Sequence, residues 1–375
     1  MSDSNSEKNL SLTERLIPDS FYTVIKQERI FLGLIGFFFF AAGVTFPYAE
    51  IAMWVGFIFA GYSAIANDSI QTIGTFLASN QDKKWWHLWL YIGGIFLVVV
   101  TVSFIIFDGD VSYQRLASKG FETTPTDFSF LQVAAPIFLL ILTRMRMPVS
   151  TTFLLLSCFA TSASSITGVL GKSLSGYFLA FAAGLIVWLL VTKALEEKFS
   201  KSKPKNYWTP IQWVTSGSLW AVWVMQDAAN VAVYLPRSLS LGQFLGFALF
   251  IFFGLGILFY LRGDKIQRIV TEKSRVTDIR SATIIDFIYA ILLVYKLTVS
   301  TVPMSTTWVF LGLLAGREIG MSITSSRKMG KPMGKVVKII FKDLSYALFG
   351  LLVSILLAIS INADVREEIL GYIGL

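Results

Sequence analysis

The chain has 375 residues, of which 54% are hydrophobic and 15% charged, and its mean hydropathy is +0.65. Soluble domains are about 25% charged, so these values exclude a disordered chain, a disulfide scaffold and an ordinary soluble enzyme. The 32 Lys and Arg residues exceed the 24 Asp and Glu residues, for a net charge of +8, but they cluster in short loops between apolar segments. This clustering indicates membrane topology and no binding to nucleic acid. We therefore expect an all-α polytopic protein in a lipid bilayer.

Cys and His are each present once. Cys158 lies in an apolar segment, where it is expected to serve packing, and His87 lies near a loop beside Lys83 and Lys84. A single His excludes a metal centre with several His ligands, and it also argues against catalysis by His. We expect no enzyme and no resident cofactor.

Apolar segments long enough to cross a bilayer, roughly 20 residues, recur along the chain. Residues 1–29 are polar and resemble a cytoplasmic tail, with no cleavable signal peptide. The sequence then predicts about eleven transmembrane segments, near 30–47, 50–79, 86–107, 129–144, 148–167, 173–192, 208–235, 240–262, 283–300, 303–320 and 343–363. The segments at 50–79 and 208–235 are too long for one uninterrupted span, so we expect a broken helix in each.

Three loops, at 193–205, 262–280 and 327–342, hold most of the Lys and Arg residues. The positive-inside rule places such loops in the cytoplasm. With eleven crossings all three fall on one side, with the N-terminus in the cytoplasm and the C-terminus outside. We expect a multi-pass protein of the plasma (inner) membrane.

Two motifs occur twice. The segment MPVSTTFLLLS at 147–157 returns as VPMSTTWVFLG at 302–312, and Asn67-Asp68-x-x-Gln71 returns as Gln226-Asp227-x-x-Asn230. The motifs come in the same order and at nearly the same separation, which indicates an internal repeat.

The topology makes the two copies inverted, because the segment with Asp68 runs inward and the segment with Asp227 runs outward. Inverted repeats are typical of secondary transporters, whose sites lie at the membrane midplane where helices break. The predicted organisation is a tail at 1–29, an extra transmembrane helix at 30–47, repeat 1 at 50–192, a basic cytoplasmic linker at 193–207, repeat 2 at 208–365 and a tail at 366–375.

Asp68 and Asp227 lie well inside apolar segments. A carboxylate at the bilayer centre costs about 2.5–3.5 kcal/mol on insertion scales, and a bound cation would offset that cost. Carboxylate and amide oxygens suit Na⁺, whereas a bare Asp could carry H⁺. The i, i+3 spacing puts an amide on the face of each acid. The predicted cation site comprises Asn67, Asp68, Gln71, Gln226, Asp227 and Asn230, with Asp68 and Asp227 as Na⁺ ligands; the alternative is that each Asp is a hydrogen-bonded packing residue.

Each Pro-x-Ser-Thr-Thr motif predicts the first turn of a helix, because Pro favours that position. Free N–H groups, the positive end of the helix dipole and three hydroxyls together would hold an anion. The predicted oxyanion site comprises Ser150, Thr151, Thr152, Ser305, Thr306 and Thr307. The alternative is that these hydroxyls bond to carbonyls one turn earlier.

At these residues the chain resembles the inorganic phosphate transporter (PiT) family, which also includes sulfate permeases. Its pattern is two inverted copies of G-x-N-D-x-x-N-x-x-G-T and of P-x-S-T-T-H, and the resemblance covers about 50–365. The resemblance implies that the Asp and amide residues bind the cation and the hydroxyl turns bind phosphate. The chain departs from the pattern at several positions: Gln71 and Gln226 replace Asn, Phe153 and Trp308 replace His, and motif glycines are missing.

The predicted function is symport of inorganic phosphate with Na⁺ or H⁺. Sulfate or another oxyanion is the nearest alternative, and a structural or regulatory membrane protein that lost transport is an alternative of another class. The oligomeric state is open, with a homodimer as one form, and no role is assigned to Lys296, Arg317 or Glu318.

Overall fold

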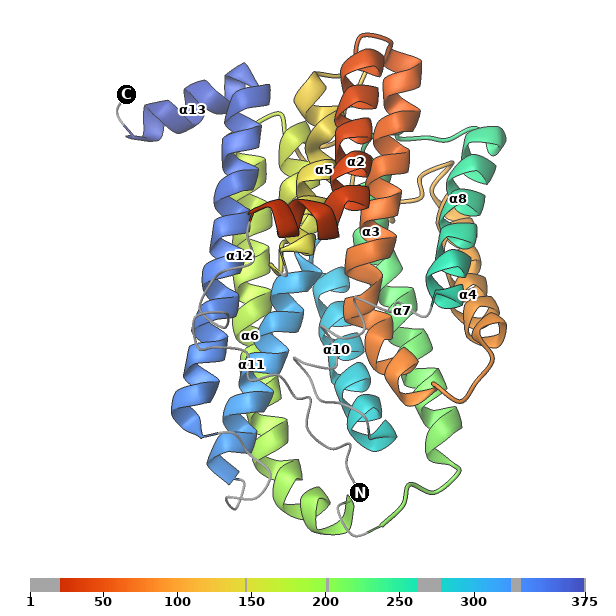
Figure 1. The fold of residues 1–375 in the computed structure, drawn as a ribbon, viewed down its shortest axis with the longest axis vertical. Coiled ribbons are helices and arrows are strands. Elements are labelled where there is room, and N and C mark those ends of the chain that lie inside the picture. Colours follow the sequence, from red (N-terminus) through yellow and green to blue (C-terminus); the bar gives the residue numbers. More distant parts are fainter. Residues whose placement is uncertain (1–20, 146, 200–201, 262–277, 325–331, 374–375) are drawn as a thin grey trace, which may run out of the picture.

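A computed structural model describes residues 21–145, 147–199, 202–261, 278–324 and 332–373, with backbone alone at 21–27, 69–71, 191–199 and 372–373. Every regular element in these ranges is a helix (Figure 1). They are α2 (Phe21–Thr45), α3 (Ala49–Ser79), α4 (Trp85–Ile106), α5 (Phe130–Arg144), the short η1 (Thr152–Leu156) and η2 (Ser157–Phe159), α6 (Ala163–Phe199), α7 (Trp208–Ala232), α8 (Leu241–Tyr260), α10 (Ile279–Val299), α11 (Thr306–Thr324), α12 (Met333–Ile361) and α13 (Ala363–Ile373).

The outer surface of the bundle is apolar. Seven helices of the described chain are long and apolar enough to cross a bilayer. Large apolar side chains stand exposed on them, such as Phe40 at 70% and Leu190 at 72%. Such a surface is stable against lipid and not against water. The all-α polytopic membrane class predicted from the sequence is confirmed.

The two long apolar segments are uninterrupted helices. α3 has 31 residues and α7 has 25, so the breaks expected in 50–79 and 208–235 are absent. α3 contains no Pro, and Pro210 lies in the first turn of α7, where a missing N–H costs little. At 1.5 Å per residue α3 is about 46 Å long, so it tilts or extends beyond the hydrocarbon core.

The chain breaks instead after the first Pro-x-Ser-Thr-Thr motif. A π-helix and a 3₁₀ turn are followed by extended backbone at Ala160, and Ser162 then accepts the Ser165 N–H at the start of α6. The span expected at 148–167 is therefore wrong, because a short irregular helix ends at Phe159. The span expected at 173–192 lies within the 37-residue α6, which begins earlier, at Ala163. Ser and Thr side chains compete with the backbone for its hydrogen bonds, which weakens helix continuity here.

The ends of the chain also differ from the expectations. The helix expected at 30–47 begins earlier, at Phe21, and α13 occupies most of the predicted tail at 366–375. Glu368 of α13 accepts the Ala163 N–H at 2.7 Å, which places a carboxylate at the start of α6. Residues 1–20 of the N-terminal tail, and parts of the three basic loops, lie outside the described residues.

The helices that carry the two acid motifs cross in opposite directions. α3 runs down and α7 runs up in Figure 1. Asn80, just after α3, donates to Gln212, near the start of α7, at 2.9 Å. The helices α7, α10 and α12 all begin at one end of the molecule. We call it the basic end, because Lys203, Lys205, Lys335 and Lys338 lie there.

α6 and α11 lie side by side with their backbones in contact (Figure 1). A Cβ atom on Gly312 would overlap the carbonyl oxygen of Tyr177, and one on Gly316 would overlap that of Phe181. Gly320 continues this four-residue spacing. Small residues at this spacing let membrane helices approach closely, so the last helix of predicted repeat 1 is held against the hydroxyl-motif helix of predicted repeat 2.

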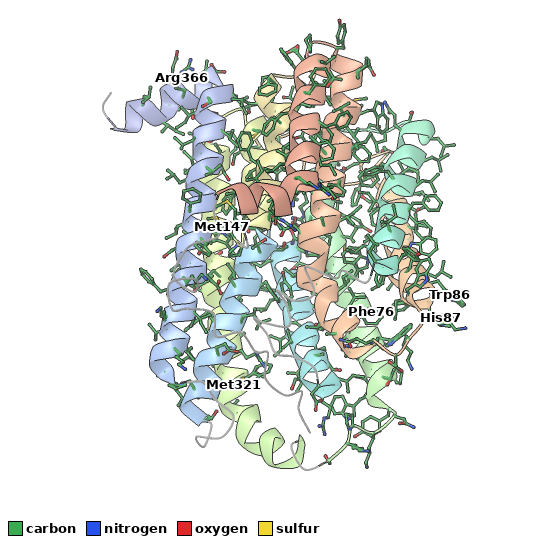
Figure 2. All side chains as sticks on the ribbon, in the orientation of Figure 1. Phe76, Trp86, His87, Met147, Met321 and Arg366 are labelled. Carbon is green, nitrogen blue, oxygen red and sulfur yellow. The ribbon has the colours of Figure 1, made fainter. Side chains whose placement is uncertain are left out.

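The only His lies at the edge of the bundle. Figure 2 places His87 beside Trp86 at the start of α4, where His87 is exposed. The two rings are 3.6 Å apart. His87 is therefore remote from the buried polar residues described next.

Candidate functional site

The acids of the two repeated motifs meet where α3 and α7 cross. Asp68 is 2% exposed and Asp227 is 4% exposed. The two carboxyl groups are close enough to interact electrostatically. Within the described chain, neither acid has a Lys or Arg in contact to balance its charge.

An amide accompanies each acid. Asn230 Nδ2 donates to Asp227 Oδ1 at 2.6 Å, across one helical turn. Asn67 Nδ2 donates to Asp68 Oδ1 at 2.8 Å, although the two residues are adjacent. Gln226 is buried, and neither atom of its amide has a partner. The side chain of Gln71 lies outside the described residues.

The two hydroxyl motifs begin their helices in the same way. Ser150 Oγ accepts the Phe153 N–H at 3.1 Å, and Ser305 Oγ accepts the Trp308 N–H at 3.3 Å. Each Ser is therefore an N-cap, and each Pro stands two residues before the cap instead of in the first turn. Each Ser hydroxyl still has a hydrogen to donate.

Threonines bring both hydroxyl motifs to the acids. Thr152 Oγ1 donates to Asp227 Oδ1 at 3.4 Å, so predicted repeat 1 touches the acid of predicted repeat 2. Thr306 also lies beside Asp227, and Thr151 lies beside Asp68. Thr307 follows Thr306 in the chain and is equally buried. Acids and hydroxyls predicted from the repeat thus share one buried cluster, which we call the central cluster.

Two aromatic residues that the motif analysis missed hold the second hydroxyl motif. Trp223 Nε1 donates to Thr306 Oγ1 at 3.2 Å, and the Tyr289 hydroxyl donates to the Thr306 carbonyl oxygen at 2.9 Å. Trp223 lies one turn before Asp227 on the same face of α7, a spacing that could have been noticed. Nothing in the sequence around Tyr289 distinguishes it from other aromatics in apolar segments.

Two cations fix the end of α10, just before the second hydroxyl motif. Arg115 donates to the carbonyl oxygens of Leu297, at 3.0 Å, and Ser300, and Lys172 Nζ donates to that of Ser300 at 2.8 Å. Burial lowers the pKa of Arg115 to about 10, which leaves it charged at neutral pH. Cations at a helix C-terminus are favourable, and they set the level at which α11 begins.

Six buried polar atoms around the central cluster have no hydrogen-bond partner: Thr151 Oγ1, Gln226 Oε1 and Nε2, Asp227 Oδ2, Asn230 Oδ1 and Trp308 Nε1. Buried polar atoms are nearly always paired, so this concentration marks a place for polar ligands. Asp227 Oδ2 and Asn230 Oδ1 are acceptors that suit a small cation. Thr151 Oγ1 and Trp308 Nε1 can donate to an oxyanion.

The rings of Phe153 and Trp308 meet edge to face, with centroids 5.4 Å apart. They occupy the two positions at which the PiT pattern has His. The contact joins the two hydroxyl motifs directly. Relative to the PiT pattern, two aromatic rings stand in place of two titratable His side chains.

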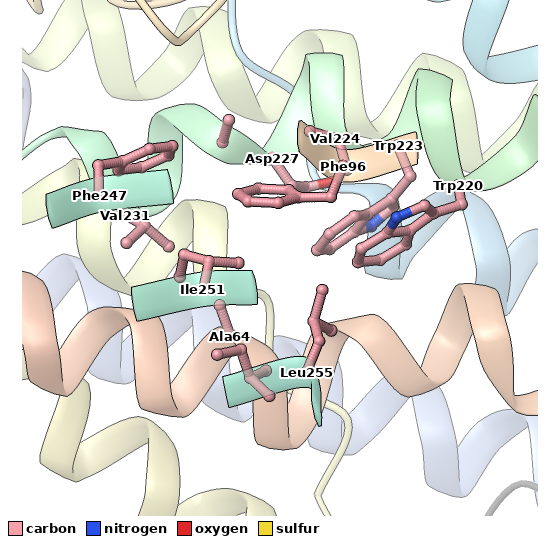
Figure 3. Close-up of a pocket in the computed structure, with 12 residues that line it drawn as sticks. Ala64, Phe96, Trp220, Trp223, Val224, Asp227, Val231, Phe247, Ile251 and Leu255 are labelled. Carbon is pink, nitrogen blue, oxygen red and sulfur yellow. The ribbon is translucent and has the colours of Figure 1, made fainter. Parts of the chain in front are cut away.

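An apolar cavity lies beside the central cluster (Figure 3). Phe96, Trp220, Phe247 and other apolar side chains line it, and Asp227 is the one acid at its wall. A lining of this kind offers almost no donors to an oxyanion. The candidate ion site is therefore the central cluster and not this cavity.

No family model matches the sequence, and no curated protein matches it. A solved structure, the sodium-dependent phosphate transporter, matches with a TM-score of 0.51 over 85% of this chain and 98% of that chain, at 16% identity. At this identity the likeness concerns the fold alone. The motif resemblance to the PiT family is thus accompanied by a likeness in fold, and the chain has the fold of a sodium-dependent phosphate transporter.

Proposed function

We propose that the chain is a secondary active transporter that carries inorganic phosphate across a membrane together with Na⁺ or H⁺. One observation carries the proposal: two helix starts with hydroxyl side chains meet two acids in one buried cluster. The solved structure with the same fold is named a sodium-dependent phosphate transporter, which supports phosphate ahead of sulfate. Na⁺ or H⁺ is cargo here, and the chain needs no resident cofactor.

The charges of the cluster give a physical reason for coupling. An oxyanion placed beside Asp68 and Asp227 would be repelled by both carboxylates, strongly so in a medium of low dielectric. Na⁺ ions or protons on the two acids remove this repulsion. The anion then binds well only when the cation is present, which is the requirement for symport.

The helix starts supply the attraction for the anion. In the first turns of η1 and α11, the N–H groups that Ser150 and Ser305 do not cap have no partner within the helix. The 19-residue α11 adds the positive end of its dipole. Thr151 and Thr306 add hydroxyls at the same place. Such a site holds an oxyanion without a buried Lys or Arg.

Access would alternate between the two sides of the membrane. Asp68 and Asp227 are nearly buried, so the cluster is closed to water on both sides. Rocking of helices that are related by inversion would open one side and then the other. We place the basic end in the cytoplasm of a plasma (inner) membrane, and we expect the N-terminal tail on the same side from the positive-inside rule.

The test is uptake of radiolabelled phosphate by proteoliposomes, with and without an imposed Na⁺ or pH gradient. A gradient should drive accumulation, and unlabelled phosphate should compete better than sulfate. Asp68→Asn and Asp227→Asn should each reduce driven uptake about tenfold or more, because bonds to charged groups contribute about 1.5–3 kcal/mol. The matched control is Asp364→Asn, at an exposed position of α13, which should transport normally.

Other outcomes would identify the alternatives. Stronger competition by sulfate would make the chain a sulfate permease of the same fold. If neither anion is taken up and neither raises the unfolding temperature of the purified protein, the chain is a structural or regulatory membrane protein, and the proposal is wrong. Normal driven uptake by both Asn variants would reject the assignment of the cation to these acids.

A further inference from the structure

A third buried acid joins the helices that carry the first two. Asp286 of α10 is 1% exposed. Its Oδ1 accepts the Thr75 hydroxyl of α3 at 2.8 Å, and its Oδ2 pairs with the Ser216 hydroxyl of α7 at 2.5 Å. One carboxyl group therefore links α3, α7 and α10 on the basic-end side of the central cluster.

Within the part of the chain that the structure describes, charged side chains from the neighbouring helices do not balance Asp286. On α10, Arg280 pairs with Asp278, and the Tyr289 hydroxyl donates to Thr306. On α3, Asp68 lies about two turns from Thr75, and on α7, Asp227 lies about three turns from Ser216. The remaining groups face elsewhere: on α6, Lys172 binds carbonyl oxygens at the far end of α10, and on α11, Arg317 pairs with Glu318.

An unbalanced carboxylate is costly in this position. A buried charge without a partner loses several kcal/mol of hydration, and two hydroxyl bonds offset only part of that loss. A protonated carboxyl group avoids the cost. It accepts the Thr75 hydroxyl and donates its own O–H to Ser216 Oγ, whose hydrogen can turn to a backbone carbonyl one helical turn earlier.

A polar face of α3 connects Asp286 with the basic end. Asp68, Thr72, Thr75 and Ser79 follow one another at three- or four-residue spacing, which places them on one face. At the end of that face Gln212 donates to Ser79 and accepts from Asn80. Asp286 thus lies on a line of polar side chains between the central cluster and the surface.

The corresponding helix of predicted repeat 1 has no such group. α5, which precedes the first hydroxyl motif as α10 precedes the second, contains no acid. Among the described residues, Asp286 therefore has no acidic counterpart on α5, and the two repeats differ at this point.

We propose that Asp286 is a proton-binding site: it holds a proton at neutral pH while α3, α7 and α10 are together, and it releases that proton towards the basic end when these helices separate. Proton binding by Asp286 stands independently of transport. The coupling of its release to uptake rests on the proposed function.

The direct test is infrared difference spectroscopy of the purified full chain at neutral pH. Subtraction of the Asp286→Asn spectrum from that of the unaltered protein should leave the C=O band of a protonated carboxylic acid. Carboxylate bands in that difference would overturn the proposal. The control Asp364→Asn, at an exposed acid, should lose carboxylate bands instead.

A second variant keeps the test valid if Asp286→Asn does not fold. Ser216→Ala removes the acceptor of the carboxyl O–H and should shift the acid band to higher frequency, whereas an ionised Asp286 would leave that region of the spectrum unchanged. Both spectra are independent of transport, so they distinguish a failure here from a failure of the proposed function.

Coupling is tested by the pH dependence of uptake in proteoliposomes. At pH values well above the pKa of an acid, its protonated fraction falls about tenfold per pH unit, so uptake by the unaltered protein should fall at alkaline pH. Asp286→Asn, which mimics the neutral form, should flatten this alkaline fall to less than about threefold. An unchanged profile would show that Asp286 has no part in coupling, even if the infrared band is present.

Discussion

The two hydroxyl motifs start alike and continue differently. Ser150 and Ser305 cap their helices through equivalent bonds. After the first motif the chain leaves helical geometry at Ala160, whereas after the second it forms the 19-residue α11, held against α6 by glycines. The repeated residues therefore specify the start of each helix, and the contacts with neighbouring helices determine its length.

The largest effect should come from a larger residue at the glycine contact between α6 and α11, which supports only the second motif. A Cβ in Gly316→Ala would overlap backbone atoms of α6, which cannot move aside as a side chain can. We expect a loss of about 3 kcal/mol in the free energy of unfolding, at the upper end for overpacking. Thermal unfolding and gel filtration of the detergent-solubilised protein measure it.

The control for this change is Gly94→Ala, because a Cβ on Gly94 would have no atom within 4 Å. Ala is also the better helix former, so Gly94→Ala should be neutral or slightly stabilising. Equal stability of the two variants would show that α11 is not held by α6.

An intermediate effect should separate the equivalent threonines of the two motifs. Thr152 bonds to the Asp227 carboxyl, whereas no bond to an acid is formed by Thr307. Thr152→Val should lower cation-driven phosphate uptake about tenfold, as expected for a bond to a charged group. Thr307→Val should lower it less than about threefold. The reverse order would mean that the hydroxyl of Thr307, and not that of Thr152, supports cation-driven uptake.

The smallest effect should be the same in both motifs. Ser150→Ala and Ser305→Ala each remove one buried N-cap, which costs about 1 kcal/mol. The unfolding temperature should fall by a similar amount in each variant. A much larger fall for one of them would contradict the equivalence of the two helix starts.

The central cluster could be predicted because its parts recur. A single buried Asp or one Ser-Thr-Thr triplet has a plain packing explanation, but the pairing of Asp68 with Asp227 and of the two triplets in the same order indicated a shared site. A role for Asp286 could not be predicted in this way, since this residue has no counterpart in the first repeat. The role of Tyr289 could not be predicted either, because it depends on the Thr306 carbonyl oxygen, which only the folded chain brings near.

The course of the helices was predicted less well than their class. Apolar composition reports that a segment lies in lipid, and the membrane class followed from it. Whether a helix continues past an acid depends on whether neighbouring side chains satisfy that acid. Asn67 does so at Asp68 through a hydrogen bond, and Thr151 lies beside the same carboxyl group, so α3 continues, although its length alone favoured a break.

The backbone contact of α6 with α11 crosses the boundary between the two predicted repeats. Because each partner belongs to a different half of the sequence, neither half can cover its own glycine-lined surface. A chain cut at 202–207, between α6 and α7, should therefore give two fragments that are insoluble apart and assemble when made together.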